Sequence, residues 1–226
     1  MIRTTGLTKT FGDKLALDSV SIAFDSGAIH GVVGANGAGK TTMFRCLAGL
    51  YQYRGSVDFT DSSDIRNIGF MPANPEMLSR ITGREYLQLM CSARGISPPD
   101  LDEKNVFDLP LNAYAESYST GMTKKLALTG VLLQKNSVFL LDEPFSGVDI
   151  QSNIVIKEVI RKLKDLNKTV VMSSHIFSSL YDVCDTLHLL SDGQLVRSEL
   201  PAGFAEIEKM MAGGEIGDKI DRLELE

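Results

Sequence analysis

The chain carries Gly34-Ala35-Asn36-Gly37-Ala38-Gly39-Lys40-Thr41, which matches the pattern G-x-x-x-x-G-K-[ST] and continues into Thr42. Glycines in such a loop let successive backbone N–H groups converge on phosphate oxygens, because no Cβ atom stands in the way. Lys40 would place a positive charge near the β and γ phosphates of a nucleotide, and Thr41 would offer a hydroxyl to Mg²⁺. The sequence therefore predicts that this loop binds a nucleoside triphosphate, ATP together with Mg²⁺.

Strand and helix patterns alternate on both sides of the loop. The apolar run at residues 29–33 predicts a strand before it, and residues 42–47 predict a helix after it, whose N-terminus would favour an anion. Later apolar runs at residues 138–141 and 169–172 predict buried strands. A helix with one apolar face is predicted by Ile156, Val159, Ile160 and Leu163. This alternation predicts an α/β fold with a mostly parallel sheet.

A different pattern covers about residues 75–133, which we expect to form a mostly helical lobe. Thr82 and Glu85 have the spacing of a capping box, and apolar residues at helical spacing follow them. The run Ser97-Pro98-Pro99-Asp100 would break that helix. The lobe is therefore expected to interrupt the strand–helix core.

Two acids follow the apolar run at residues 138–141. In a parallel α/β sheet ligands gather at the carboxyl ends of the strands, which would bring Asp142 and Glu143 to the phosphate loop. Asp142 would then hold the Mg²⁺ shell through water, and Glu143 would polarise the water that attacks the γ-phosphate. The other interpretation is an ordinary turn, because Asp-Glu-Pro is common turn chemistry. The phosphate loop favours the functional interpretation.

Composition and charge exclude several classes of protein. The 226 residues suit one large domain, or one domain with an inserted lobe. A formal net charge of −6 argues against nucleic-acid binding, which usually needs a basic face. The cysteines match no metal-ligand spacing and suit a reducing compartment. Because no apolar run has membrane length and the start lacks a signal-peptide core, we expect a cytosolic protein that reaches a membrane only by docking on a partner.

Together these motifs resemble those of the ATP-binding-cassette (ABC) transporter ATPases. Residues 34–42 resemble the phosphate loop of that family, and Leu140-Leu141-Asp142-Glu143-Pro144 resembles its second acidic motif with the catalytic glutamate. Tyr118-Ser119-Thr120-Gly121-Met122 is similar to the signature motif, and Ser146-Gly147-Val148-Asp149 is similar to the D-loop. Ser173-Ser174-His175 is similar to the run that ends in the switch histidine. The motifs occur in the order that the family shows.

The resemblance implies a role for each residue. Glu143 and His175 would be catalytic, and Thr41 and Asp142 would hold Mg²⁺. In the family, the helix that starts at the signature motif points at the γ-phosphate held by a second protomer. The residues implied to contact nucleotide are Phe11, which would stack on adenine, the loop residues Gly34, Ala35, Asn36, Gly37, Ala38, Gly39, Lys40, Thr41 and Thr42, and Ser119, Gly121 and Asp149. Structural alternatives are a core Phe11, an ordinary helix N-cap at Ser119 and a buried, satisfied His175; His30 and His188 are interpreted as structural.

The chain departs from the family pattern after residues 68–72. The family usually has a glutamine there, which touches Mg²⁺ and the attacking water and couples the site to the membrane part of the transporter. This chain has Ala73, which has no side chain for either task, followed by Asn74. The lobe between Asn74 and Ser119 is also shorter than the family suggests, and residues 102–112 show no clear helical period. Slow hydrolysis or altered coupling therefore stays open.

The resemblance implies one ABC ATPase domain over residues 1–226. Its fold would be a P-loop NTPase core with a mostly parallel sheet (residues 1–74 and 134–200), an antiparallel β subdomain, a short inserted helical subdomain at about 75–133, and a C-terminal extension at 201–226. The implied partners are a second nucleotide-binding subunit, identical or homologous, and a separate transmembrane permease chain, with no nucleic acid. The chain would be cytoplasmic and peripheral on the inner face of the membrane.

The signature form Y-S-T-G-M resembles exporter subunits more than import systems. Two other functions stay open. One is a soluble ABC ATPase that moves no solute, although repair types carry a long coiled coil and translation types carry two cassettes, and this chain has neither. The other is a weakly hydrolysing regulatory nucleotide sensor, which Ala73 suggests and which Glu143 and His175 argue against.

Overall fold

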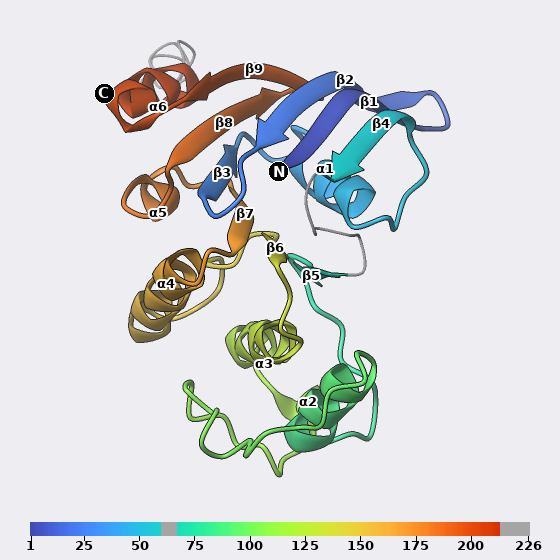
Figure 1. Cartoon of the computed structure of the whole chain (residues 1–226), viewed down its shortest axis with the longest axis vertical. Helices are drawn as coiled ribbons and strands as arrows, with labels where there is room; N and C mark the ends of the chain where they lie inside the picture. Colours follow the sequence, from blue (N-terminus) through green and yellow to red (C-terminus); the bar gives the residue numbers. More distant parts are fainter. Residues whose placement is uncertain (60–66, 213–226) are drawn as a thin grey trace, which may run out of the picture.

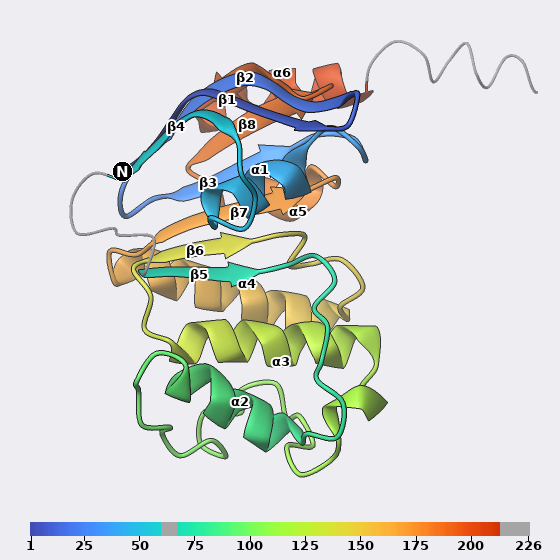
Figure 2. The ribbon, with the colours of Figure 1, turned by 90° about the vertical axis from the view of Figure 1, so that its right-hand side faces the viewer.

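The computed structural model describes residues 1–59 and 67–212, and the strands form two sheets. The smaller sheet has the order β2-β1-β4 and is antiparallel throughout. Its strands are β1 (Ile2–Phe11), β2 (Lys14–Phe24) and β4 (Arg54–Phe59). Figures 1 and 2 show it near one end of the molecule, and in Figure 2 helix α1 (Lys40–Leu47) lies between it and the larger sheet. The predicted antiparallel β subdomain is confirmed.

The larger sheet has the order β5-β6-β7-β3-β8-β9. Its strands are β5 (Ile68–Met71), β6 (Val138–Leu141), β7 (Thr169–Ser174), β3 (Ile29–Val33), β8 (Thr186–Ser191) and β9 (Gln194–Glu199). All pairings are parallel except that of β8 with β9, so the predicted mostly parallel sheet is confirmed. The register pairs Val33 with Ser174 and Leu141 with Met172. The carboxyl ends of β3, β6 and β7 therefore meet at one edge.

The central strands β3, β6 and β7 of the larger sheet are buried on both faces, because their side chains alternate between two hydrophobic clusters. Val138 and Leu140 pack with α1 and the smaller sheet, whereas Phe139 and Leu141 pack with the helices of the opposite layer. Those helices include α3 (Thr120–Leu133), α4 (Ile150–Asp165) and α5 (Ser178–Tyr181). Fully burying such a side chain stabilises the fold by about 1.5–3 kcal/mol. Burial on both faces explains why the apolar runs at residues 29–33, 138–141 and 169–172 are continuous and predict buried strands.

The inserted segment is helical at its two ends. Helix α2 (Gly83–Ser92) begins at the predicted capping box: the Glu85 N–H donates to Thr82 Oγ1 at 3.2 Å, and the Thr82 N–H donates to the Glu85 carboxylate at 2.7 Å. Helix α3 ends the segment after a short 3₁₀ turn, η2 (Ala115–Ser117). Between α2 and η2, residues 93–113 contain no helix or strand. The expectation of a mostly helical lobe therefore holds for the ends of the segment and not for its middle.

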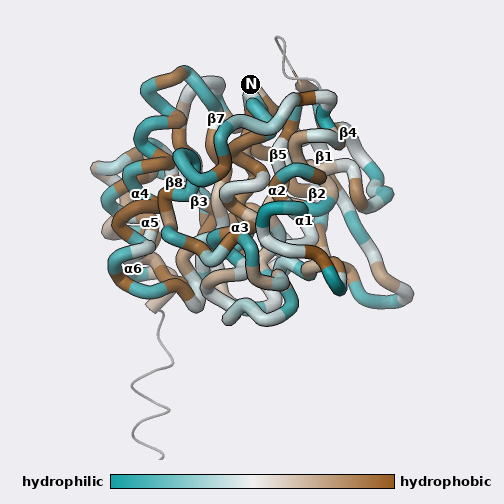
Figure 3. Tube along the Cα trace, turned by 90° about the horizontal axis from the view of Figure 1, so that it is seen from below, coloured by the Kyte–Doolittle hydropathy of each residue, from teal (hydrophilic) through white to brown (hydrophobic). Residues whose placement is uncertain are grey.

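After β9 the chain forms η3 (Pro201–Gly203) and α6 (Phe204–Ala212). Phe204 and Ile207 are fully buried, so the first part of the predicted C-terminal extension belongs to the core. The rest of that extension, residues 213–226, lies outside the described residues. Within residues 1–59 and 67–212, no helix is long and apolar enough to cross a membrane. Figure 3 shows hydrophilic and hydrophobic residues intermixed along α4, α5 and α6.

Candidate functional site

The phosphate loop runs from β3 into α1 along a path that only glycine fits at both ends. A Cβ atom at Gly34 would lie 2.2 Å from the carbonyl oxygen of Leu190, and one at Gly39 would lie 2.7 Å from that of Ala16. Gly39 is the N-cap of α1 with a φ of 105°, in the left-handed region, and no side chain caps the helix. The first N–H groups of α1 therefore stay available to an anion.

The turn between β8 and β9 supports the loop from behind. The N–H of Gly193 donates to the carbonyl of Ala38 at 3.0 Å, and the carbonyl of Gly193 accepts from the N–H of Asp18 at 2.9 Å. Gly193, in the turn between β8 and β9, therefore connects the phosphate loop to β2 of the smaller sheet.

A pocket of about 680 Å³ opens at the loop, within the size range of small-molecule sites. It is lined by Phe11, Lys14, Leu15, Ala16, Asn36, Gly37, Gly39, Lys40, Thr41, Thr42, Ala73, Asn74, Lys124, Glu143, Ser146, His175, Asp192 and Gly193. Most of the predicted contact residues are therefore brought together by the fold. Those that do not line it are Gly34, Ala35, Ala38, Ser119, Gly121, Asp142 and Asp149.

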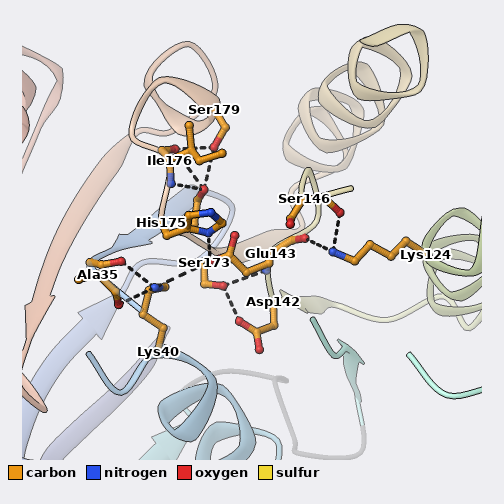
Figure 4. Close-up of polar contacts among 12 residues, drawn as sticks. Ala35, Lys40, Lys124, Asp142, Glu143, Ser146, Ser173, His175, Ile176 and Ser179 are labelled. Carbon is orange, nitrogen blue, oxygen red and sulfur yellow. Dashed lines mark hydrogen bonds and ion pairs between the residues drawn. The ribbon is translucent and has the colours of Figure 1, made fainter. Parts of the chain in front are cut away.

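Lys40 lies at the centre of the loop. Its Nζ donates to the carbonyl oxygens of Gly34 at 2.7 Å and Ala35 at 3.1 Å, and lies 3.8 Å from Oε1 of Glu143 (Figure 4). Burial lowers the pKa of Lys40, and the nearby carboxylates of Glu143 and Asp142 oppose that shift. The ammonium group therefore lies between the loop backbone and the two predicted acids.

Asp142 directly follows β6 and is fully buried. Its Oδ1 accepts a hydrogen bond from Oγ of Ser173 at 2.5 Å, whereas its Oδ2 has no partner among the described residues. A buried carboxylate oxygen without a partner costs free energy unless a cation or water satisfies it. Thr41 lines the adjoining pocket with a hydroxyl. This set of oxygen donors fits Mg²⁺, which prefers carboxylate, hydroxyl and water ligands.

Glu143 and His175 meet at the carboxyl edge of the sheet. His175 Nδ1 lies 2.9 Å from Glu143 Oε1, and the Glu143 side chain is largely buried. Glu143 has a φ of 51°, a left-handed backbone that few residues other than glycine adopt. A carboxylate, an imidazole and the ammonium of Lys40 therefore surround one part of the pocket (Figure 4). The His175 side chain is 36% exposed, which excludes the interpretation of His175 as a buried core histidine.

Sequence reasoning missed two side chains that organise these acids. The hydroxyl of Ser173 donates to Asp142 and accepts from the backbone N–H of Glu143 at 2.9 Å, so it bridges both residues. The Nζ of Lys124 donates to the carbonyl of Glu143 at 3.0 Å and to that of Ser146 at 2.7 Å. The signal for Ser173 is a polar residue that directly follows the apolar run of residues 170–172, still within the buried strand β7. For Lys124 the signal is its place on α3 one turn before the apolar residues Ala127 and Leu128.

Phe11 ends β1 at the rim of the pocket and is 45% exposed. Its ring stands edge-on to that of Tyr51 with a centroid distance of 5.4 Å, and Lys9 Nζ lies 4.8 Å from its centroid. This exposure excludes the interpretation of Phe11 as a core residue. An exposed ring at the mouth of the pocket suits stacking on a nucleobase.

The signature and D-loop residues lie outside this pocket. Ser119 is the N-cap of α3 and accepts the N–H of Met122 at 3.3 Å, as the capping interpretation predicts. Asp149 is the N-cap of α4, and its hydrogen bonds from Ser152 hold the pKa of this carboxyl well below its usual range. A Cβ atom at Gly121 would lie 2.9 Å from the carbonyl oxygen of Gly147, so the two runs pack against each other.

The other histidines and the cysteines take part in packing. His30 and His188 stack in the core with ring centroids 5.5 Å apart. Burial lowers the pKa of both rings, and that of His188 to about 3, so they stay neutral near pH 7. The three cysteines are free and buried.

Comparison with known proteins identifies the family. Residues 17–146 match the family model described as ABC transporter. The chain belongs to the ABC transporter family. It is 30% identical over 217 residues to the ABC transporter ATP-binding protein NatA of Bacillus subtilis (strain 168), covering 87% of this chain and 88% of NatA. It is 32% identical over 222 residues to the bacitracin transport ATP-binding protein BcrA of Bacillus licheniformis, covering 89% of this chain and 70% of BcrA.

Solved structures of ABC proteins share this fold. An ATP-binding subunit of an ABC transporter superposes with a TM-score of 0.82 at 21% identity, over 99% of both chains. A dimeric ATP-binding cassette in a post-hydrolysis state, bound to ADP and Pi, has a TM-score of 0.78 at 23% identity, over 89% of this chain and 99% of that one. The predicted P-loop NTPase fold of an ABC ATP-binding subunit is therefore confirmed.

The departure from the ABC pattern lies in the wall of the pocket. Ala73 and Asn74 follow β5, and both line the pocket. The position where the ABC resemblance predicts a glutamine therefore faces the site, but it carries only the methyl group of Ala73. Asn74 is the neighbouring polar side chain and is exposed.

Proposed function

We propose that this ABC family member binds ATP with Mg²⁺ in the pocket and hydrolyses it to drive a transporter. The observation that carries this proposal is the meeting of Lys40, Glu143 and His175 beside the uncapped N-terminus of α1. The loop N–H groups would hold the phosphates. Thr41 and Asp142 would hold Mg²⁺, which supplies positive charge to the β and γ phosphates when bound.

Hydrolysis requires a water oxygen to attack the γ-phosphorus while the bond from that phosphorus to the β-phosphate oxygen breaks. Glu143 would orient this water and accept its proton, because the carboxylate lies in the pocket between Lys40 and His175. His175 holds Glu143 through Nδ1, which leaves Nε2 to contact the γ-phosphate. Lys40 would neutralise the charge that develops on the phosphate oxygens. ADP and phosphate would then leave.

A second protomer would complete the site. Ser119, Gly121 and Asp149 lie outside the pocket of their own chain, and Ser119 is exposed at the N-terminus of α3. Such a helix end favours an anion brought by another molecule. The dimeric cassette bound to ADP and Pi has the same fold. We therefore propose that two copies, or one copy and a homologue, close face to face over two ATP molecules.

Mixing two inactive variants tests this composite site. Lys40→Met should disable the loop side of a site, and Ser119→Arg the opposing side, so each variant alone should hydrolyse little ATP. In a mixed dimer one of the two sites keeps both intact halves, so an equimolar mixture should recover about a quarter of the wild-type rate. The measurement is the steady-state ATPase rate before and after mixing. A wild-type rate for Ser119→Arg alone would contradict the assignment.

Transport is the proposed use of this ATPase. Residues 1–74 and 134–200 would form the catalytic core, and the subdomain at about 75–133 would face a separate permease. The chain would then be cytoplasmic and peripheral on the inner face of the membrane. The Y-S-T-G-M form of residues 118–122 supports an exporter, and the relative named for bacitracin transport supports a transport role.

The permease proposal predicts a membrane partner. Purification of the tagged chain from detergent-solubilised membranes should recover a polytopic membrane protein in a fixed ratio to it. Mass spectrometry of the purified complex measures that ratio, and an untagged chain is the control. Recovery of the whole chain from the soluble fraction, without such a partner, would favour a soluble ABC ATPase instead.

A further inference from the structure

Lys124 is a buried lysine on α3 that lies beside the catalytic acids without being one of the predicted site residues. It is 4% exposed, and its Nζ donates to the backbone carbonyls of Glu143 and Ser146 at 3.0 and 2.7 Å (Figure 4). It forms no ion pair with any residue that the structure describes. Burying a cation costs free energy. Packing therefore does not account for a lysine here, where an apolar side chain would fill the same space.

The two carbonyls belong to the turn that carries Glu143. The backbone of Glu143 is left-handed, its N–H donates to Oγ of Ser173 on β7, and its carbonyl accepts from Lys124 on α3. The residue is therefore held from β7 on one side and from α3 on the other. These two contacts fix the backbone from which the Glu143 side chain extends. The direction of the Glu143 carboxylate therefore depends on the positions of β7 and α3.

Helix α3 is also the end of the inserted segment. It begins at the Ser119 cap and continues through Lys124 as one regular helix of 14 residues. A displacement of the segment that carried α3 with it would move this helix as a unit. Such a displacement would also move the ammonium group that holds the carbonyl of Glu143.

We propose that Lys124 is a positioning residue for ATP hydrolysis, which links the orientation of α3 to the direction of the Glu143 carboxylate. This inference rests on the proposed function. Lys124 would touch neither the water nor the phosphorus, so its loss should slow turnover without weakening ATP binding. A misplacement of a catalytic group by about 1 Å can lower the rate about 100-fold.

The test compares Lys124→Met, Lys124→Arg and a matched control, Lys157→Met. Methionine keeps the length of the side chain and removes the donors, whereas arginine keeps donors that can reach a carbonyl. Lys157 lies on α4, and its Nζ is 3.4 Å from the carboxylate of Asp182, away from the pocket. For each variant we would measure kcat and KM for ATP, the stoichiometry of ADP binding, and Tm.

Lys124→Met should lower kcat between about 10-fold and 100-fold, with KM and the ADP stoichiometry unchanged. Lys124→Arg should recover part of that loss, and Lys157→Met should match the wild type. Equal kcat for Lys124→Met and the wild type would overturn the inference, and so would a loss of ADP-binding sites in proportion to kcat. If Lys124→Met does not fold, Lys124→Gln takes its place. A kcat of Lys124→Gln equal to that of the wild type would likewise overturn the inference. Failure of the proposed ATPase function can be told apart from failure of this inference. In that case the wild type itself would show no ATPase rate that depends on Glu143.

Discussion

Replacing Glu143 by glutamine should lower kcat for ATP hydrolysis by about 10²- to 10⁴-fold, the range expected when a general base is lost. Glutamine has the same shape and can still accept a hydrogen bond from His175, but it cannot take a proton from the attacking water. The contact of Glu143 Oε1 with His175 Nδ1 at 2.9 Å and with Lys40 Nζ at 3.8 Å places its carboxylate for this task. ATP affinity should stay close to that of the wild type, because the phosphate loop is unchanged.

A coupled assay for ADP release measures kcat, and titration with a fluorescent ATP analogue measures affinity. The matched control is Glu158→Gln, which removes an exposed carboxylate on α4 that pairs with Arg161. It should retain the wild-type rate, since exposed pairs contribute little. Equal background rates in the wild type and Glu143→Gln, with normal ATP binding, would favour the nucleotide sensor over the ATPase.

Replacing Lys40 by methionine should weaken ATP binding by about 100-fold, or about 3 kcal/mol, the upper range for a hydrogen bond to a charged group. Nζ of Lys40 already lies among the loop carbonyls of Gly34 and Ala35, so a small movement brings it to a bound phosphate. Methionine fills the space of the alkyl chain and lacks the charge. Loss of affinity, rather than loss of the fold, is therefore the expected result.

Isothermal titration with ATP and Mg²⁺ measures the affinity of Lys40→Met. The rise in Tm on adding ATP gives a second measurement, because a ligand that binds only the folded state stabilises it. Lys162→Met is the control, since Lys162 is exposed on α4. Wild-type affinity in Lys40→Met would show that residues 34–42 do not bind the triphosphate as proposed.

The elements around the pocket could be predicted because each is encoded by contiguous residues. The apolar run of β3, the glycines of the loop and the helix that follows them need no distant contact to be recognised. The parallel sheet follows from the alternation of strands and helices, and it brings the ends of β6 and β7 to the loop. The meeting of Glu143 with His175 at one edge is a consequence of that topology.

The support of the site could not be predicted in the same way. Ser173 holds Asp142 and Glu143 from 31 and 30 residues away in the sequence, and Lys124 holds Glu143 from 19 residues away. These contacts depend on tertiary packing, and the position of a serine or lysine in the sequence does not tell which backbone groups or carboxylates it will hold. The burial of the middle of the inserted segment could not be predicted either, because its buried leucines at residues 101, 109 and 111 follow neither a helical nor a strand period.

Leu190 and Gly193, which pack behind the phosphate loop, determine how much of the chain a fragment with an intact loop needs. All the motifs lie between Phe11 and His175, but Leu190 contacts Gly34, and Gly193 joins Ala38 to β2. A chain truncated after His175 would keep every motif and lose both of these contacts. Its glycine loop would then be exposed to solvent on the side that β8 now covers. We therefore expect the shortest fragment that folds with an intact phosphate loop to extend through the β8–β9 hairpin, past His175.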